Sequence, residues 1–168
     1  MLSLAPANSA EDFDVAAGFC RQLGVWDASL SPSHGVPADI VLSLFNSDTS
    51  DSLAAKFNAP PDAVMLIARW EEVPAGCIAF NAFDETSAEI HKFYVDPQFR
   101  GKGIGSAMMR AALAEIGTTQ RRRVMLHTAF YMESAIALYE AFDFVRCERF
   151  RPSPDIVSHT DVFMSRAL

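Results

Sequence analysis

Cysteine is scarce in this sequence, and the few cysteines form no recognisable pattern. The 168 residues include only Cys20, Cys77 and Cys147, an odd number at wide spacing and without a CxxC pair. Such a set excludes a disulfide framework and a cysteine-based zinc site. The four histidines are equally scattered and form no HExxH pair. The sequence therefore predicts a protein without a bound metal.

Basic residues are also in short supply. Lys and Arg number 14 against 21 Asp and Glu, so the formal net charge is −7. Nucleic-acid binding requires clustered cations that neutralise phosphates, and this balance excludes it as a general function. The excess of acid is compatible with cationic partners such as amines, and equally with solubility alone.

Long apolar runs are missing as well. The longest candidate, Ala63 to Ala68, is far shorter than the roughly 20 residues that span a bilayer. Met1 to Pro6 contain neither the basic start nor the apolar stretch of a secretory signal. These absences predict a cytoplasmic protein that makes no membrane contact.

The composition that remains is that of an ordinary globular protein. Half of the residues are hydrophobic, 21% are charged, and 13 are Phe, which is enough apolar surface for a sizeable core. No internal repeat or inter-domain linker is visible. We therefore expect one domain over residues 1–168.

Hydrophobic periodicity predicts alternating helices and strands. The first helix is expected to begin near Asn8 and Ser9 and to end at Gly24, with residues 25–38 forming a loop. Further helices are expected at about 38–45, 103–116 and 132–142, a helical turn near 53–57, and strands at 63–70, 75–83, 88–95, 124–129, 144–150 and 160–165. This order predicts an α/β (α+β) fold with a mixed sheet.

A glycine-rich turn between an expected strand and a helix is the main functional signal. It reads Gly101-Lys102-Gly103-Ile104-Gly105-Ser106 and follows Arg100. The start of a helix has unpaired amides and a positive partial charge, and glycines let the backbone approach a phosphate closely. The turn therefore predicts an anion site in an otherwise acidic protein.

The spacing of this turn excludes two familiar phosphate motifs. A Walker A loop requires GxxxxGK[ST], and here Gly103 follows Lys102. The dinucleotide pattern GxGxxG fails because its third glycine falls at Ser106. Spacing alone leaves two alternatives open, a tight connection without a ligand and a nucleotide-binding fold with another phosphate ligand.

Two stretches resemble the GNAT family of N-acetyltransferases. Residues 89–105 resemble the family's motif A, whose pattern [RQ]xxGx[GA] is matched by Arg100, Gly103 and Gly105. Residues 135–144 resemble motif B, which usually ends in LYExxGF. The resemblance implies a mostly antiparallel central sheet that is flanked by helices, with strands splayed apart at the cofactor site.

The same resemblance implies acetyl-CoA as co-substrate and no metal. The glycine-turn amides would hold the CoA pyrophosphate, free backbone groups in the splayed strand would pair with the pantetheine arm, and the Val95 amide would polarise the thioester carbonyl. The residues implied in binding are Phe93, Tyr94, Val95, Arg100, Gly101, Lys102, Gly103, Ile104, Gly105 and Ser106.

Catalytic residues follow from the resemblance and from residue chemistry. Tyr139 is expected to protonate the CoA thiolate; the alternative is a core aromatic on an apolar helix face. Glu89 or His91 is expected to take the amine proton, since both lie on one face of the strand. The alternative for this pair is an ordinary exposed strand face.

Two departures from the family pattern leave a second function open. Met132 stands where Asn often contacts the cofactor, and Asp143 replaces the usual glycine, which predicts a different turn into the next strand. A non-catalytic acetyl-CoA sensor or interaction domain is therefore the alternative to an enzyme. For an enzyme, the acceptor could be a small-molecule amine or a peptide amine, and a homodimer is an expectation from the family.

Overall fold

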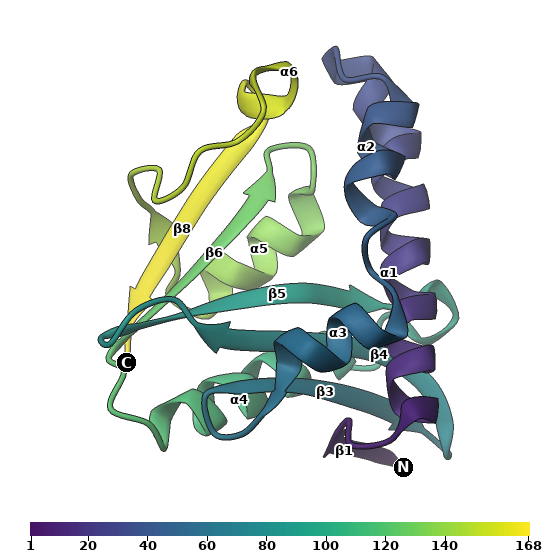
Figure 1. Ribbon diagram of the computed structural model, residues 1–168, viewed down its shortest axis with the longest axis vertical. Coiled ribbons are helices and arrows are strands. Elements are labelled where there is room, and N and C mark those ends of the chain that lie inside the picture. Colours follow the sequence, from purple (N-terminus) through teal and green to yellow (C-terminus); the bar gives the residue numbers. More distant parts are fainter.

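The computed structural model describes residues 1–168, and a mixed sheet of eight strands forms its centre (Figure 1). The strands are β1 (Leu2–Pro6), β2 (Asn58–Ala59), β3 (Ala63–Trp70), β4 (Val73–Ala82), β5 (Ser87–Val95), β6 (Arg123–Ala129), β7 (Val145–Arg146) and β8 (Asp161–Ala167). Their order is β1-β3-β4-β5-β6-β8-β7, and β2 pairs with β3. Only β5 and β6 pair in parallel, so the expected fold class is confirmed.

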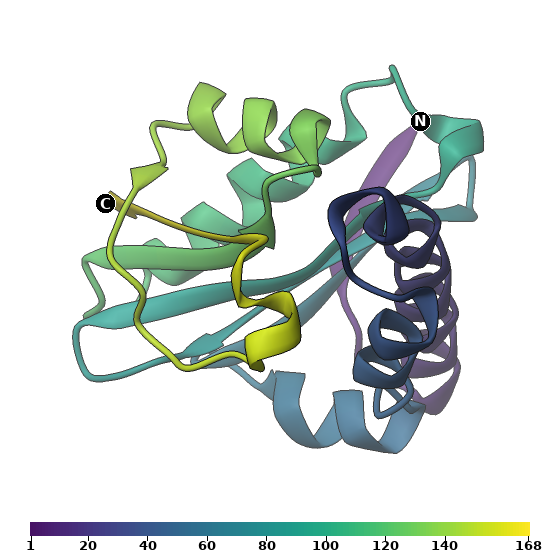
Figure 2. The same cartoon turned by 90° about the horizontal axis from the view of Figure 1, so that it is seen from above.

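Helices cover both faces of the sheet (Figure 2). They are α1 (Ala10–Leu30), α2 (Ala38–Phe45), α3 (Ser50–Phe57), α4 (Ile104–Gly117), α5 (Glu133–Ala141) and α6 (Asp155–Ser158), with short 3-10 helices η1 (Ser31–His34) and η2 (Pro97–Phe99). α4 and α5 lie on one face, and α1 and α3 lie on the other. None of the helices combines the length and the apolar character that crossing a membrane requires.

Strand β3 explains why the two cores form. Leu66 and Ala68 pack into the core beneath α4, whereas Met65 and Ile67 pack into the core beneath α1 and α3. Successive strand residues point to opposite faces, so a continuous apolar run is buried on both sides. The apolar stretch from residue 63 onward therefore becomes an interior strand.

The first helix is longer than the sequence predicted. Ser9 caps its start by accepting a hydrogen bond from the amide of Asp12, as expected, but the helix continues through Gly24 to Leu30. A Cβ atom at residue 24 would lie 2.8 Å from Cγ of Phe45 on α2. Gly24 thus permits close helix packing rather than ending the helix, and residues 25–30 are helical instead of looped.

Three smaller differences concern the strand boundaries. The opening apolar segment forms edge strand β1 against β3, and β4 begins at Val73 because Glu71 and Glu72 make a tight turn with positive φ. The strand expected at 144–150 is wrong beyond Arg146. The amide of Cys147 still donates to the carbonyl oxygen of Phe163 on β8, and beyond it Arg149 and Arg151 pair with acidic side chains.

Strands β5 and β6 pair for only a short distance. The parallel register runs from Ser87 with Arg123 to Glu89 with Met125, and no pairs follow. From residue 90 onward β5 keeps only its antiparallel partner β4. The splayed strands that the resemblance implied are therefore present, and they begin directly after Glu89.

A bulge in β5 sits inside this splayed region. His91 opposes Ala79 and Tyr94 opposes Cys77, so two residues of β5 face Ile78 alone. Lys92 has a φ of 52°, and such an extra residue bends the strand and redirects the side chains that follow. Across the bulge, Phe93 is turned into the core beneath α4.

Gly76 lies where β4 packs closely against the end of β5. A Cβ atom there would lie 2.5 Å from the carbonyl oxygen of Tyr94, which belongs to the backbone and cannot rotate away. We expect Gly76→Ala to lower the free energy of unfolding by about 1–3 kcal/mol in urea titrations. The control, Gly117→Ala, meets nothing within 4 Å and should be neutral or slightly stabilising. Equal stabilities of the two variants would contradict this account.

Candidate functional site

The glycine-rich turn forms the start of α4 and presents a row of free amides. Gly101 and Gly103 have φ values of 78° and 74°, a left-handed conformation that disfavours other residues. No backbone carbonyl accepts a hydrogen bond from the amides of residues 101–106, and the first helical bond runs from Ala107 to Gly103. Adjacent free amides at the positive end of a helix are a binding site for an anion.

A hollow of about 310 Å³ opens beside this turn, and we call it the glycine-turn hollow. Its lining comprises Trp26, Phe93, Tyr94, Val95, Phe99, Arg100, Gly101, Gly103, Ile104, Gly105, Ser106, Ser134, Ala135 and Leu138. Every residue expected to bind the cofactor is included except Lys102.

The two basic residues of the turn have different surroundings. The ammonium group of Lys102 lies 4.9 Å from the ring centroid of Trp70, away from the hollow. The guanidinium of Arg100 lies over Trp26 at 4.9 Å, and its Nε donates to the carbonyl oxygen of Val95 at 3.1 Å. Arg100 is therefore held at the rim of the hollow, whereas the side chain of Lys102 does not take part in it.

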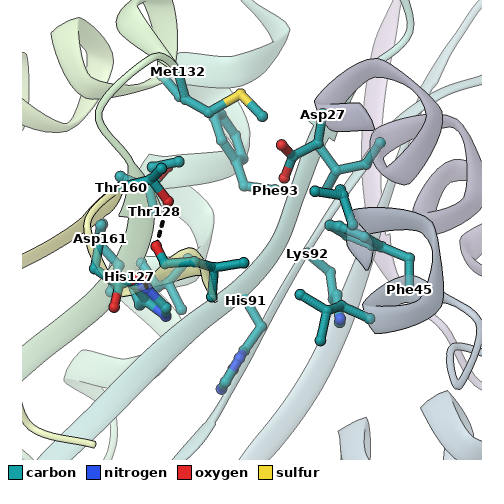
Figure 3. A pocket seen from close by; sticks show the side chains of 18 of the residues that line it. Asp27, Phe45, His91, Lys92, Phe93, His127, Thr128, Met132, Thr160 and Asp161 are labelled. Atoms are coloured by element: carbon teal, nitrogen blue, oxygen red, sulfur yellow. Dashed lines mark hydrogen bonds and ion pairs between the residues drawn. The ribbon is translucent and has the colours of Figure 1, made fainter. Parts of the chain in front are cut away.

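A second and larger space, the central cavity, fills the gap between the splayed strands (Figure 3). Its volume is about 470 Å³, and residues 90–93 of β5 and 126–129 of β6 line its two sides. Trp26, Phe93 and Ala135 line both the central cavity and the glycine-turn hollow. The two spaces therefore adjoin at these three residues.

Tyr139 of α5 lines the central cavity close to this junction. Its ring centroid lies 5.9 Å from that of Phe93 and 6.1 Å from that of Phe144. Its hydroxyl group makes no hydrogen bond within the protein. Burial raises the pKa of Tyr139 well above its usual value, because the charged phenolate would lose its hydration. The phenol is therefore protonated at neutral pH.

Glu89 and His91 both line the central cavity, where sequence analysis expected a base. Glu89 is 4% exposed and forms an ion pair with Arg151. One of its oxygens lies 3.4 Å from Nε2 of His91. Neither residue is on an exposed strand face, so that alternative is wrong for both.

His91 is held apart from the centre of the cavity. Its Nε2 is 2.9 Å from the side-chain oxygen of Asn81, and its ring packs against Phe57 of α3. Figure 3 shows the imidazole directed away from Met132. Burial lowers the pKa of His91 to about 4, and the nearby Lys92 acts in the same direction. The ring is therefore neutral at pH 7 and is a weak base.

Sequence analysis missed several charged residues of the cavity. Asp27 lies on the helical extension that was expected to be a loop, and the hydroxyl of Tyr131 donates to it. Lys92 pairs with Asp48 at 2.8 Å, far away in the sequence. Asp27 stands beside Trp26 in the stretch expected to be a loop, and spacing gave it no role.

A family model supplies the decisive comparison. The model described as the acetyltransferase (GNAT) family matches residues 36–144. The chain belongs to the acetyltransferase (GNAT) family. The recognition based on residues 89–105 and 135–144 is thus confirmed, and GNAT enzymes use acetyl-CoA as the acetyl donor.

Curated relatives match parts of this GNAT chain. An uncharacterized N-acetyltransferase of Methanocaldococcus jannaschii is 40% identical over 57 residues, which are 34% of this chain and 25% of that protein. An uncharacterized N-acetyltransferase of Schizosaccharomyces pombe is 29% identical over 102 residues, or 58% of this chain and 63% of that protein. The chain thus spans less than two thirds of the length of either relative.

Solved structures match the whole GNAT fold. The PaiA N-acetyltransferase of Thermoplasma acidophilum, in complex with coenzyme A, has a TM-score of 0.77 at 14% identity over 100% of this chain and 99% of its own. An acetyltransferase of Streptococcus agalactiae has a TM-score of 0.74 at 16% identity, over 99% and 98%. At such identities these matches establish the shared fold.

The two departures from the GNAT motifs have different structural outcomes. Asp143 has a φ of 65°, a left-handed conformation that glycine adopts without strain. Aspartate is one of the few residues that tolerate this conformation. Met132 is buried at the start of α5 and lines the central cavity, where it supplies an apolar surface in place of an amide.

The left-handed glycines of the turn lead to a prediction about the binding of coenzyme A. Gly103→Ala places a Cβ on a left-handed residue and strains the row of amides, so we expect coenzyme A to bind at least tenfold more weakly. Isothermal titration calorimetry measures this change. The comparison variant Lys102→Ala removes a side chain that lies over Trp70, and it should change the affinity less than threefold. The reverse order of effects would contradict the assignment of the anion site to the backbone.

Proposed function

We propose that this GNAT protein transfers the acetyl group of acetyl-CoA to a primary amine. The observation that carries this proposal is the junction at Trp26, Phe93 and Ala135, where the amide-lined hollow meets the central cavity. A thioester that enters through the hollow would face the cavity that holds Tyr139 and Glu89. Two adjoining spaces of different chemistry suit a reaction between two substrates.

The hydrogen-bond donors that line the glycine-turn hollow suit coenzyme A. The free amides of residues 101–106 match the diphosphate, and the guanidinium of Arg100 lies at the same rim. The amide of Asp96 donates to β4, so the amide of the preceding Val95 is directed away from β4, because neighbouring strand residues alternate. In this proposal the Val95 amide polarises the thioester carbonyl and Phe93 to Val95 line the path of the pantetheine arm.

The proposed reaction is a direct attack without a covalent enzyme intermediate. The amine nitrogen forms a bond to the acetyl carbon while the carbon–sulfur bond breaks. Glu89 or His91 accepts the proton that the amine loses, and Tyr139 donates a proton to the departing thiolate. Tyr139 is proposed for this role because it lines the central cavity beside Phe93, at the junction with the glycine-turn hollow.

Two observations favour Glu89 over His91 as the base. The pKa of His91 is lowered to about 4, and its Nε2 is engaged with Asn81. Glu89 retains carboxylate oxygens in the cavity wall, although Arg151 shares them. We therefore propose Glu89 as the group that receives the proton, either directly or through water, and His91 as its neutral neighbour.

A non-catalytic acetyl-CoA sensor is the competing function, and Met132 in place of an asparagine is the observation in its favour. Thiol release from acetyl-CoA distinguishes the two functions. Amino acids, polyamines, aminoglycosides and peptide termini form the panel of acceptors. Binding of coenzyme A without thiol release on any of them would support the sensor and contradict the enzyme.

Tyr139 gives the sharpest test of the catalytic proposal. We expect Tyr139→Phe to lower kcat more than tenfold, because the thiolate then leaves without a proton donor. The phenyl ring keeps the packing against Phe93 and Phe144, so the melting temperature and the Kd for acetyl-CoA should be unchanged. An unchanged kcat would remove Tyr139 from the mechanism.

The base is tested by the pH dependence of kcat/KM. Glu89→Gln should lower the rate about 100-fold and abolish the decline at acidic pH, because that decline reports protonation of the base. His91→Gln should keep the wild-type profile from pH 5.5 to 8, since a group with a pKa of about 4 is neutral throughout that range. The control Glu140→Gln, exposed on α5, should match the wild type. Loss of the acidic decline in His91→Gln alone would reverse the assignment.

A further inference from the structure

Almost every charged side chain around the central cavity already has a partner of opposite charge. Glu89 pairs with Arg151, and Lys92 pairs with Asp48 at 2.8 Å. Asp161 is shared by His127 at 2.7 Å and by Arg149 at 3.3 Å, and His91 contacts Glu89 and Asn81. These pairs leave the cavity without a free cation.

Asp27 is the exception among the acids. It forms no ion pair, and its one hydrogen-bond partner is the hydroxyl of Tyr131. Its carboxylate is half-buried and points into the cavity toward Phe93 and Met132 (Figure 3). Burial raises the pKa of Asp27, and the Tyr131 hydroxyl partly offsets this effect. A desolvated carboxylate without a cation is costly, so the fold does not gain from it.

Asp27 lies near the junction of the central cavity and the glycine-turn hollow. Its neighbour Trp26 and the facing Phe93 both belong to the wall that the cavity shares with the glycine-turn hollow. A cation held by Asp27 would therefore lie on the side of the cavity nearest the proposed thioester. Aromatic rings at this end, Trp26, Tyr131 and Phe93, also favour a cation.

We propose that Asp27 binds the ammonium group of the acceptor, which releases one proton to solvent before the neutral amine attacks, and that the acceptor is a small primary amine with an apolar body and no carboxylate. This inference rests on the proposed acetyl transfer. Leu23, Val41, Leu44 and Phe45 supply the apolar wall for the body of the amine. An acceptor carboxylate would find no unpaired cation in the cavity, so amino acids are disfavoured relative to the corresponding amines.

The role of Asp27 also has a consequence for stability. Because the carboxylate has no cationic partner, Asp27→Asn removes a desolvation cost while an amide oxygen can still accept from Tyr131. The variant is therefore expected to melt at the same temperature as the wild type or higher. A residue kept at a cost to stability is typical of a binding site.

Matched amines and amino acids test the proposal. Calorimetry with the protein–coenzyme A complex uses 3-methylbutylamine against leucine and phenethylamine against phenylalanine, and thiol-release assays with acetyl-CoA use the same four compounds. We expect each amine to bind at least tenfold more tightly than its amino acid. Asp27→Asn should weaken binding of the amines and raise their KM at least tenfold, with the Kd for coenzyme A unchanged.

A matched control removes a negative charge elsewhere in the protein, on helix α2. Asp39 is exposed on α2 and does not line the cavity, so Asp39→Asn should keep the wild-type KM for the amines. An unchanged KM for the amines in Asp27→Asn, an Asp27→Asn variant that melts below the wild type, or tighter binding of leucine or phenylalanine would overturn the role of Asp27 but leave acetyl transfer intact. Absence of thiol release with every amine, despite selective amine binding, would instead contradict the proposed function.

Discussion

The short pairing between β5 and β6 is the constraint on which the rest of this structure depends. Parallel hydrogen bonding stops at Glu89, so the second half of β5 has a partner on one side only. The bulge at Lys92 then turns the strand and sends Phe93 toward α4. Without this separation neither the central cavity nor its junction with the glycine-turn hollow would exist, because paired strands leave no space between them.

The glycine-turn hollow and the central cavity favour ligands of opposite charge, although the chain as a whole is acidic. The glycine turn attracts anions through backbone amides, which add positive potential without any net charge. Three acids line the central cavity, and Arg151 balances Glu89 and Arg149 balances Asp161, whereas Asp27 has no cation. The division suits a diphosphate on one side and an ammonium group on the other, and a net charge of −7 does not reveal it.

The structural effect of a departure from a family motif depends on the residues around it. Asp143 adopts a left-handed conformation that suits glycine best, between α5 and β7. Met132 instead changes the chemistry of the cavity wall. Both substitutions look equally disruptive in the sequence, but only a buried position that lines a cavity alters what can bind there.

The sequence by itself determined the family, the glycine turn and most of the interior strands, because these depend on local backbone conformation and on hydrophobic periodicity. Tyr139, Glu89 and His91, the catalytic candidates named from the sequence, all line the central cavity. Tertiary structure decided that Gly24 lies inside a helix, since close contact with Phe45 outweighs the tendency of glycine to end one. It alone decided which charges are balanced, because the partners of Glu89 and Asp27 lie far along the chain, and no local pattern encodes such contacts.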